Sequence, residues 1–365
     1  MTGKRNADGW VNLSTLPRVL GRLAAAALLA GLLSSPAVWA GPPGSEPPAS
    51  GVERSEVPAG NEISNWIQSI HRASREHSYS GTFVVSSASG AMASSRIWHA
   101  TDGTVQIERI EALDGTPRTV YRRDDLVRTF LPHAQIVKEE RREMPGLFPH
   151  LPQAESDAVL RHYRAQFMGR DRVAGQEAVI VWLKPKDALR FGYRIWTARA
   201  SGLVVKLQTL GMQGQVLEQA AFSQIDFDAP PTVAQLMAQM DDTRGFRLLT
   251  VPLAKTTVRE AGWQMRQAAA GFLPGDCYKR KVAPVPDTAR MPPLQCIFSD
   301  GLATVSVFFE PYDAARHAQQ TKRMDMGATQ ALALRTAHGD TWLTAVGEVP
   351  QETLRLLVDQ IEPVR

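Results

Sequence analysis

The chain has 365 residues, which is long for a single hydrophobic core and favours two domains. Its net charge of +4 arises mostly in the first 40 residues, where Lys4, Arg5, Arg18 and Arg22 are opposed only by Asp8. The remainder is therefore close to neutral, and its net charge gives no argument for nucleic-acid binding.

The first 40 residues are organised like a secretory signal peptide. Their basic residues flank a run from Leu23 to Leu33 that contains only Ala, Leu and Gly and is short for a membrane span. Small or Val residues at Val38 and Ala40 suit signal peptidase, so we predict cleavage after Ala40; the alternative is an uncleaved membrane anchor. No Cys lies near this point, and we expect a soluble, exported protein. Residues 41–60 are rich in Pro and Gly and are predicted to be a disordered lead-in.

The stretch Asn65–Val85 predicts a helix that leads into a strand. Its apolar residues recur at spacings of three and four, on one helix face: Trp66, Ile67, Ile70 and Ala73. We expect the helix to end near His77 and the strand to include Thr82–Val85, which is rich in β-forming residues. Such a strand needs a partner sheet.

Residues 61–228 alternate short β-rich runs with turn pairs such as Asp102-Gly103, which predicts nine or ten antiparallel strands. A second helix is expected over 155–167. A sheet of this length tends to curl, so the fold class is α+β, with a large antiparallel half-barrel packed on helices. A Pro-rich break follows, and we predict a linker at 229–245 and a smaller α+β domain at 246–365. That domain is expected to contain a hairpin around Asp300-Gly301 and a closing helix after Pro350.

The concave face of this half-barrel is the candidate lipid-binding surface. Apolar residues of the strands and of the first helix are predicted to line it: Trp66, Ile70, Phe83, Val85, Ile97, Ile107 and Trp182. Either these side chains only pack against the helices, or part of the concavity stays open for an acyl chain or an apolar peptide.

A basic cluster between residues 184 and 206 is the second candidate feature. Within it, Arg190 and Arg194 are expected to lie together between Trp182 and Trp196. The cluster is either a solvated outer face or a site for phosphorylated lipid headgroups or an acidic partner segment.

The sequence contains two cysteines, Cys277 and Cys296, which in an exported protein are most simply a disulfide. Two cysteines without matching His ligands make a poor metal site, so no metal is predicted. The motifs Gly-x-Ser-x-Gly and His-Glu-x-x-His and a phosphate loop are also absent. We therefore predict a protein that is not an enzyme and uses no cofactor.

The order and spacing of several stretches resemble the RseB/MucB family of periplasmic sigma-E regulators. The resemblance covers about residues 61–363 and rests on four stretches: Asn65–Val85, Ile107–Gly115, Tyr193–Trp196 and Val346–Pro350. It implies a large domain similar to the lipoprotein carriers LolA and LolB. It also implies binding of the periplasmic segment of an RseA- or MucA-like anti-sigma factor, which shields that segment from the site-1 protease.

The same resemblance implies that lipopolysaccharide or a lipid fragment displaces the partner, and that the protein self-associates as a homo-oligomer. A periplasmic lipid or lipoprotein carrier is the alternative function, although it would not need residues 245–365. An exported hydrolase is a third hypothesis, which the absence of a nucleophile motif disfavours.

Overall fold

The structure is a computed structural model, and it describes residues 60–141, 148, 156–267, 271–280, 294–315, 317, 321–337 and 339–364. The predicted signal peptide and nearly all of the predicted lead-in lie outside these residues. Within the described ranges, no helix is both long and apolar enough to cross a membrane.

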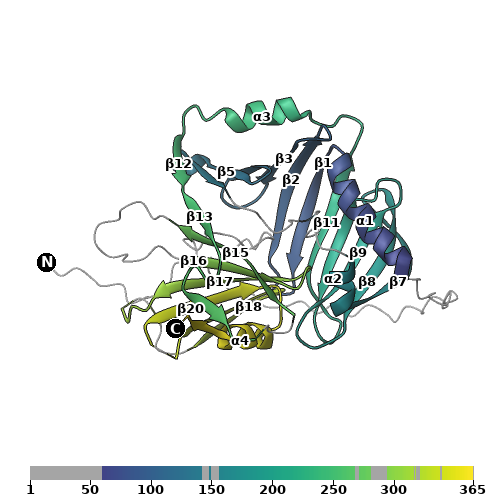
Figure 1. Ribbon diagram of the computed structural model, residues 1–365. Helices are drawn as coiled ribbons and strands as arrows, with labels where there is room; N and C mark the ends of the chain where they lie inside the picture. Colours follow the sequence, from purple (N-terminus) through teal and green to yellow (C-terminus); the bar gives the residue numbers. More distant parts are fainter. Residues whose placement is uncertain are drawn as a thin grey trace, which may run out of the picture.

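A 12-stranded sheet forms the larger part of the molecule, and it is open rather than closed (Figure 1). Its strand order is β12-β6-β5-β4-β3-β2-β1-β11-β10-β9-β8-β7. The bounds are β1 (Tyr79–Ser87), β2 (Met92–Thr101), β3 (Gln106–Ala112), β4 (Thr119–Arg123), β5 (Leu126–Leu131), β6 (Ile136–Arg141), β7 (Tyr163–Val173), β8 (Gln176–Pro185), β9 (Gly192–Ala198), β10 (Val204–Leu210), β11 (Val216–Asp226) and β12 (Arg247–Val251). A short 3-10 turn, η1 (Pro132–Ala134), joins β5 to β6. The predicted antiparallel half-barrel is confirmed.

Local signals determine the first elements of this sheet. Helix α1 (Gly60–Glu76) ends one residue before His77, as expected, and β1 follows. The β2–β3 turn uses Asp102-Gly103: the Asp102 carboxylate accepts hydrogen bonds from the backbone N–H groups of Thr104 and Val105, and Gly103 has φ +89°. These hydrogen bonds lower the pKa of Asp102, led by the one from Val105.

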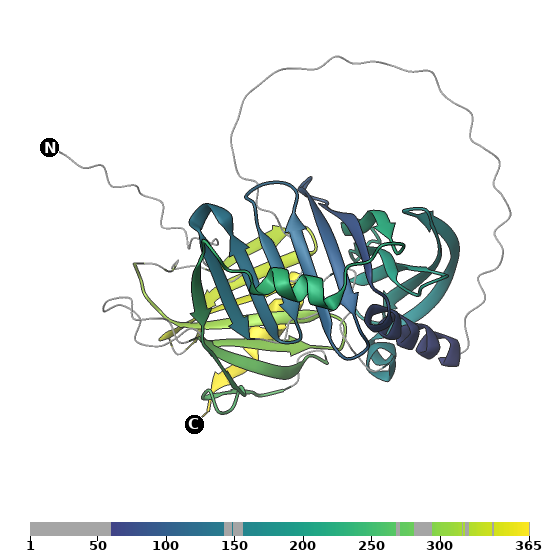
Figure 2. The ribbon, with the colours of Figure 1, turned by 90° about the horizontal axis from the view of Figure 1, so that it is seen from above.

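The helices of this part lie on opposite faces of the sheet. The apolar stripe of α1 packs into the main cluster on the concave face. Helix α3 (Val233–Asp241) packs over β2 and β3 on the outer face, where Leu236 and Met240 are buried (Figure 2). Thr232 and Gln235 form a capping box at its start, which satisfies two backbone N–H groups.

The described part of residues 61–228 contains eleven strands rather than nine or ten, and two elements differ from the sequence prediction. The helix expected over 155–167 is only α2 (Ser156–His162), and Tyr163 begins β7, because ten residues of β7 pair with β8. Residues 247–251, expected in the small domain, form β12, which pairs in parallel with β6. Tertiary pairing overrides local propensity at both places.

A seven-stranded sheet forms the rest of the molecule, with strand order β13-β15-β16-β17-β20-β19-β18. Its strands are β13 (Leu253–Thr256), β15 (Leu273–Arg280), β16 (Leu294–Ser299), β17 (Thr304–Pro311), β18 (Lys322–Met326), β19 (Thr329–Arg335) and β20 (Thr341–Gly347). A two-stranded sheet, β14 (Trp263–Met265) with β21 (Ile361–Pro363), lies beside α4 (Gln351–Asp359), the expected closing helix. We call residues 60–251 the large unit and residues 253–364 the small unit.

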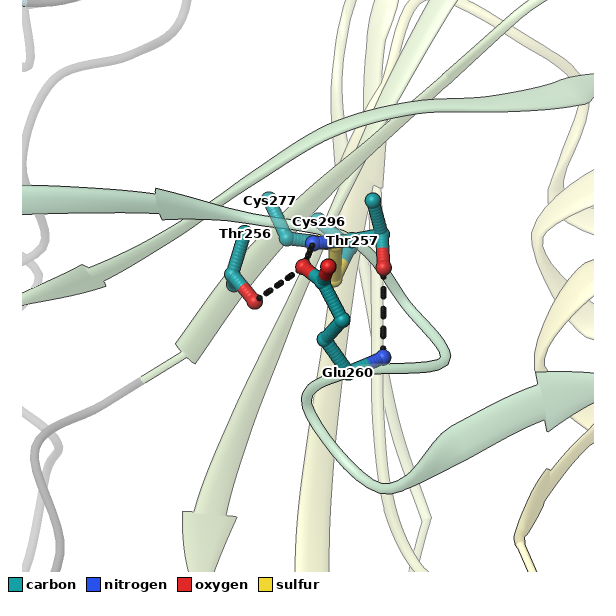
Figure 3. The surroundings of a disulfide bond; sticks show 5 residues. All are labelled: Thr256, Thr257, Glu260, Cys277 and Cys296. Atoms are coloured by element: carbon teal, nitrogen blue, oxygen red, sulfur yellow. Dashed lines mark hydrogen bonds between the residues drawn. A yellow bond between two sulfur atoms is a disulfide. The ribbon is translucent and has the colours of Figure 1, made fainter.

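The predicted disulfide is present in the small unit. Cys277 and Cys296 are direct partners on β15 and β16, are fully buried, and are joined through Sγ (Figure 3). The turn after β13 lies beside them, where the Glu260 carboxylate accepts hydrogen bonds from the Thr257 N–H and the Thr256 hydroxyl. The disulfide therefore joins two adjacent strands within the apolar cluster of the small unit.

Candidate functional site

The concave face of the large unit carries a continuous apolar cluster. Five of the predicted lipid-binding residues are buried in it together: Trp66, Ile70, Phe83, Val85 and Ile97. The α1 side chains reach the sheet directly, because the Trp66 indole N–H donates to the Thr197 hydroxyl on β9 at 3.1 Å. This hydrogen bond fixes α1 over the inner side of β9.

Three phenylalanine rings form the centre of this cluster. The Phe83 ring centroid lies 5.5 Å from that of Phe148 and 6.1 Å from that of Phe222, and Phe148 and Phe222 are 5.3 Å apart. Phe148 is itself buried, although it follows β6 in the chain and belongs to no strand. An apolar ligand that entered the concave face would have to displace or slide along these rings.

An ionic row lies beside the apolar cluster on the same face. Cross-strand register places Tyr79 opposite His99, His99 opposite Glu108, and Glu108 opposite Arg122. The Arg122 Nε donates to the Glu108 carboxylate at 3.0 Å, and Glu108 is only 2% exposed. Further along the face, the Lys138 ammonium lies 2.9 Å from the buried Glu140 carboxylate.

Tyr79 and His99 lie where the ionic row meets the apolar cluster, and burial determines the ionisation of Tyr79. The Tyr79 and His99 rings are stacked at 5.2 Å, and the His99 Nδ1 donates to the His77 carbonyl at 2.8 Å. Burial raises the pKa of Tyr79 well above its usual value; the Glu108 carboxylate raises it further, and Arg122 opposes the rise. Tyr79 is therefore neutral at physiological pH.

Ile107 and Trp182 do not join the predicted lining. Ile107 pairs with Ala100 and is buried beneath α3 on the outer face. Trp182 pairs with Arg194, and the Arg194 guanidinium donates to Gln208 at 3.3 Å. Side chains alternate along a strand, so Trp182 lies on the face opposite that of its neighbour Val181, which belongs to the concave cluster. Ile107 and Trp182 are therefore both on the outer face.

Arg190 also differs from its expected place. It precedes β9, so it does not share a strand face with Arg194. Its side chain is completely buried between the two units, where it lies 3.1 Å from the Asp300 carboxylate of the small unit and 3.2 Å from Asp187. Arg190 is thus neither on a solvated face nor accessible to a lipid headgroup.

The ionic row is not among the residues predicted from the sequence, although a signal for it exists. Ile107-Glu108-Arg109-Ile110-Glu111 reads as an alternating strand, and the buried position of Glu108 becomes evident only once its register partners are known. A pocket of about 450 Å³ lies on the outer face between α3 and β2, and it is lined by Trp98, Arg109 and Pro230 among others. Among the described residues, no group of three or more His, Cys, Asp or Glu side chains is arranged to hold a metal ion.

An open half-barrel with an apolar cluster beside an ionic row, joined to a smaller β-rich unit, defines a two-part binding protein. Family models of the MucB/RseB N-terminal domain and the MucB/RseB C-terminal domain match residues 62–241 and 257–362. The chain belongs to the MucB/RseB family.

Relatives from several bacteria extend this match over most of the chain. The sigma factor AlgU regulatory protein MucB of Pseudomonas aeruginosa is 29% identical over 314 residues, which cover 83% of this chain and 91% of MucB. The sigma-E factor regulatory protein RseB of Escherichia coli is 23% identical over 297 residues, covering 81% of this chain and 89% of RseB.

Solved structures of MucB have the same fold. MucB in complex with MucA(peri) is 27% identical, with a TM-score of 0.62 over 83% of this chain and 99% of that chain. A second structure, of the Pseudomonas aeruginosa MucA/MucB complex, has a TM-score of 0.64 with the same coverage. The match therefore includes both units.

Proposed function

We propose that this protein is a periplasmic negative regulator of a sigma-E-type stress response. It binds the periplasmic segment of a MucA- or RseA-like anti-sigma factor and shields that segment from the site-1 protease. The observation that carries the proposal is the similarity of the whole two-unit chain to a MucB that was solved with MucA(peri) bound. The protein acts by binding rather than by catalysis, in line with the regulatory names of its relatives.

Release by lipid forms the second part of the proposal. The concave cluster offers an apolar surface to an acyl chain, and the adjacent ionic row offers Arg122 and Lys138 to a phosphate or carboxylate. Both cations are already paired with buried carboxylates, so an anionic ligand has to compete with Glu108 and Glu140. A lipid releases the partner only if it favours a form with weaker partner affinity.

The lipid carrier remains the alternative function, and the small unit argues against it. A carrier needs only the concave face, whereas this chain buries an ion pair between its two units. The similarity to the MucA-bound protein also extends over both units, which is expected if both serve partner binding.

Competition binding tests the two parts together. The mature chain is immobilised, loaded with the labelled periplasmic segment of its anti-sigma factor, and titrated with lipopolysaccharide fragments. We expect saturable loading that lipid reverses; absence of loading by protein shown to be folded contradicts the proposal.

A matched pair of variants locates the lipid site. Ile70→Phe adds volume to the concave cluster and is expected to raise the lipid concentration needed for release several-fold. Ile107→Phe adds the same volume beneath α3 and is expected to leave that concentration unchanged. Both positions are buried, and overpacking is expected to cost each about 1–3 kcal/mol, so the stability of both variants is measured before their release curves are compared. Equal effects on release would place the lipid elsewhere.

A further inference from the structure

The junction between the two units contains a buried charge cluster. The Arg190 guanidinium of the large unit lies 3.1 Å from the Asp300 carboxylate of the small unit, and neither side chain is exposed. The Tyr163 hydroxyl of the large unit donates to the same carboxylate at 3.5 Å. The Phe272 ring of the small unit lies against the guanidinium, 5.6 Å from its centre.

Asp300 connects this cluster to the fold of the small unit. Its other carboxylate oxygen accepts hydrogen bonds from the backbone N–H groups of Leu302 and Ala303, at 2.9 and 2.8 Å, and so shapes the turn between β16 and β17. Leu302, at the tip of that turn, is buried in the apolar cluster of the large unit. One carboxylate therefore holds the turn and anchors it to the other unit.

Other close contacts leave little freedom at this junction. The Thr353 hydroxyl, at the start of α4, donates to the Leu189 carbonyl at 2.5 Å. Gly271 has φ +81°, and a Cβ there would lie 2.4 Å from the His162 ring. Gly327, with φ +85°, approaches Ser87 in the same way at a second point of contact. At both positions a Cβ would meet a side chain of the other unit, and the positive φ also favours glycine.

The cost of separating the buried Arg190–Asp300 pair explains why it fixes the orientation of the two units. A buried ion pair contributes little net stability compared with apolar packing, but loss of one partner leaves an uncompensated buried charge. Arg190 also lies 3.2 Å from Asp187 within the large unit, so its contact with Asp300 requires the small unit to lie against this position. An apolar junction would carry no such directional requirement.

We propose that Arg190, Asp300 and Tyr163 are positioning residues that fix the small unit on the large unit, and that this fixed arrangement sets the affinity for the anti-sigma segment. The second clause rests on the proposed function; the first does not. The cluster acts through the arrangement of the units and touches no ligand.

Three variants of the full mature chain test the positioning role. Arg190→Met keeps an apolar stem but leaves Asp300 buried without its cation. Asp300→Asn keeps an oxygen for the Leu302 and Ala303 N–H groups, so Arg190→Met combined with Asp300→Asn removes both charges without losing the turn. Arg199→Met is the control, because Arg199 forms an exposed ion pair with Glu177 in the same unit.

Hydrogen exchange gives a readout that does not involve the partner. Arg190→Met is expected to accelerate exchange at least about tenfold at residues 189–191 and 301–303, on both sides of the junction, while β9 and β17 keep their protection. The double variant is expected to lie closer to the wild type, and the control to match it. Unchanged exchange on either side of the junction in Arg190→Met overturns the positioning role. Loss of protection throughout β9 or β17 also overturns it, because the residue then supports the fold rather than the junction.

Affinity for the anti-sigma segment tests the second clause. We expect Arg190→Met to weaken binding about tenfold and the double variant to recover part of this loss. Accelerated exchange with unchanged affinity overturns the recognition clause alone. If the wild type itself fails to bind, the proposed function fails, and the exchange result still decides the positioning role.

Discussion

The large and small units bury their interiors with different chemistry. In the large unit, Glu108, Glu140 and Arg190 are buried among apolar side chains, and each has an ion-pair partner. The described interior of the small unit combines an apolar cluster with buried uncharged polar side chains such as Gln295 and Gln330, and it is held by the Cys277–Cys296 disulfide. Asp300 is the one buried carboxylate among the described residues of the small unit, and it faces the large unit.

This difference indicates separate roles for the two units, ligand binding for one and structural support for the other. Buried charge is costly unless it is paired, so a face that retains several such pairs beside an apolar cluster has the composition of a binding surface. A cross-linked apolar core is suited to hold one shape. We infer that the large unit carries the ligand chemistry and that the small unit completes and orients the binding surface.

Removal of the disulfide is expected to have the largest effect, confined to the small unit. Cys277→Ala with Cys296→Ala opens a loop with a sequence separation of 19. The chain-entropy estimate predicts a loss of roughly 3 kcal/mol in the free energy of unfolding of that unit. Denaturant unfolding monitored by hydrogen exchange in β15 and β16 measures it. The reduced wild type is the control for lost side-chain volume, and an equal loss in the large unit would contradict the comparison.

Neutralisation of the ionic row is expected to have the next largest effect. Glu108→Gln leaves Arg122 without its carboxylate, and we expect a loss of about 2 kcal/mol in the stability of the large unit, below the fully buried case because Arg122 is 23% exposed. Glu111→Gln, on the same strand, is the matched control. Glu111 is the carboxylate partner of Arg109 and is more exposed than Glu108, so its loss is expected to cost less than about 1 kcal/mol. Urea unfolding compares the two. Equal losses of stability would mean that the buried Glu108–Arg122 pair contributes no more than the exposed Glu111–Arg109 pair.

Tyr79→Phe is expected to have the smallest effect at neutral pH and a clear effect in alkali. Among the described residues the Tyr79 hydroxyl is buried without a hydrogen-bond partner, so its removal is expected to change stability at pH 7 by less than about 1 kcal/mol. The raised pKa means that the folded state disfavours ionisation. This contribution is complete below the unfolded pKa of about 10 and is lost as pH rises toward the folded pKa.

Unfolding measured from pH 7 to 11 therefore shows a smaller alkaline loss in Tyr79→Phe than in the wild type. Some loss is expected to remain, because burial also raises the pKa of Tyr163 in the large unit. An unchanged alkaline loss in Tyr79→Phe would contradict the burial of this hydroxyl.

The sequence predicts what short-range signals determine. The apolar spacing of α1, the Asp102-Gly103 turn and the Asp300-Gly301 turn are each encoded within a few residues, and all three are present. The pairing of β12 with β6 depends on residues more than 100 positions apart, and no local pattern carries it.

In the candidate site, too, some residues lie where the sequence predicts them and others do not. Five apolar residues meet in the concave cluster because α1 and the strands are in register there. Ile107 and Trp182 lie on the face opposite to the predicted one, because a one-residue difference in strand register exchanges the two faces. The partner of Arg190 is Asp300, and the sequence gives no reason to bring them together. Long-range electrostatic partners are what an isolated sequence does not reveal.

Proteolytic protection tests the central claim most directly. The periplasmic segment of the anti-sigma factor is incubated with its site-1 protease, with and without the mature chain at about ten times its dissociation constant. The account predicts that cleavage slows about tenfold and that lipopolysaccharide fragments restore the rate. An unchanged cleavage rate, with the chain folded and the protease active, would contradict it.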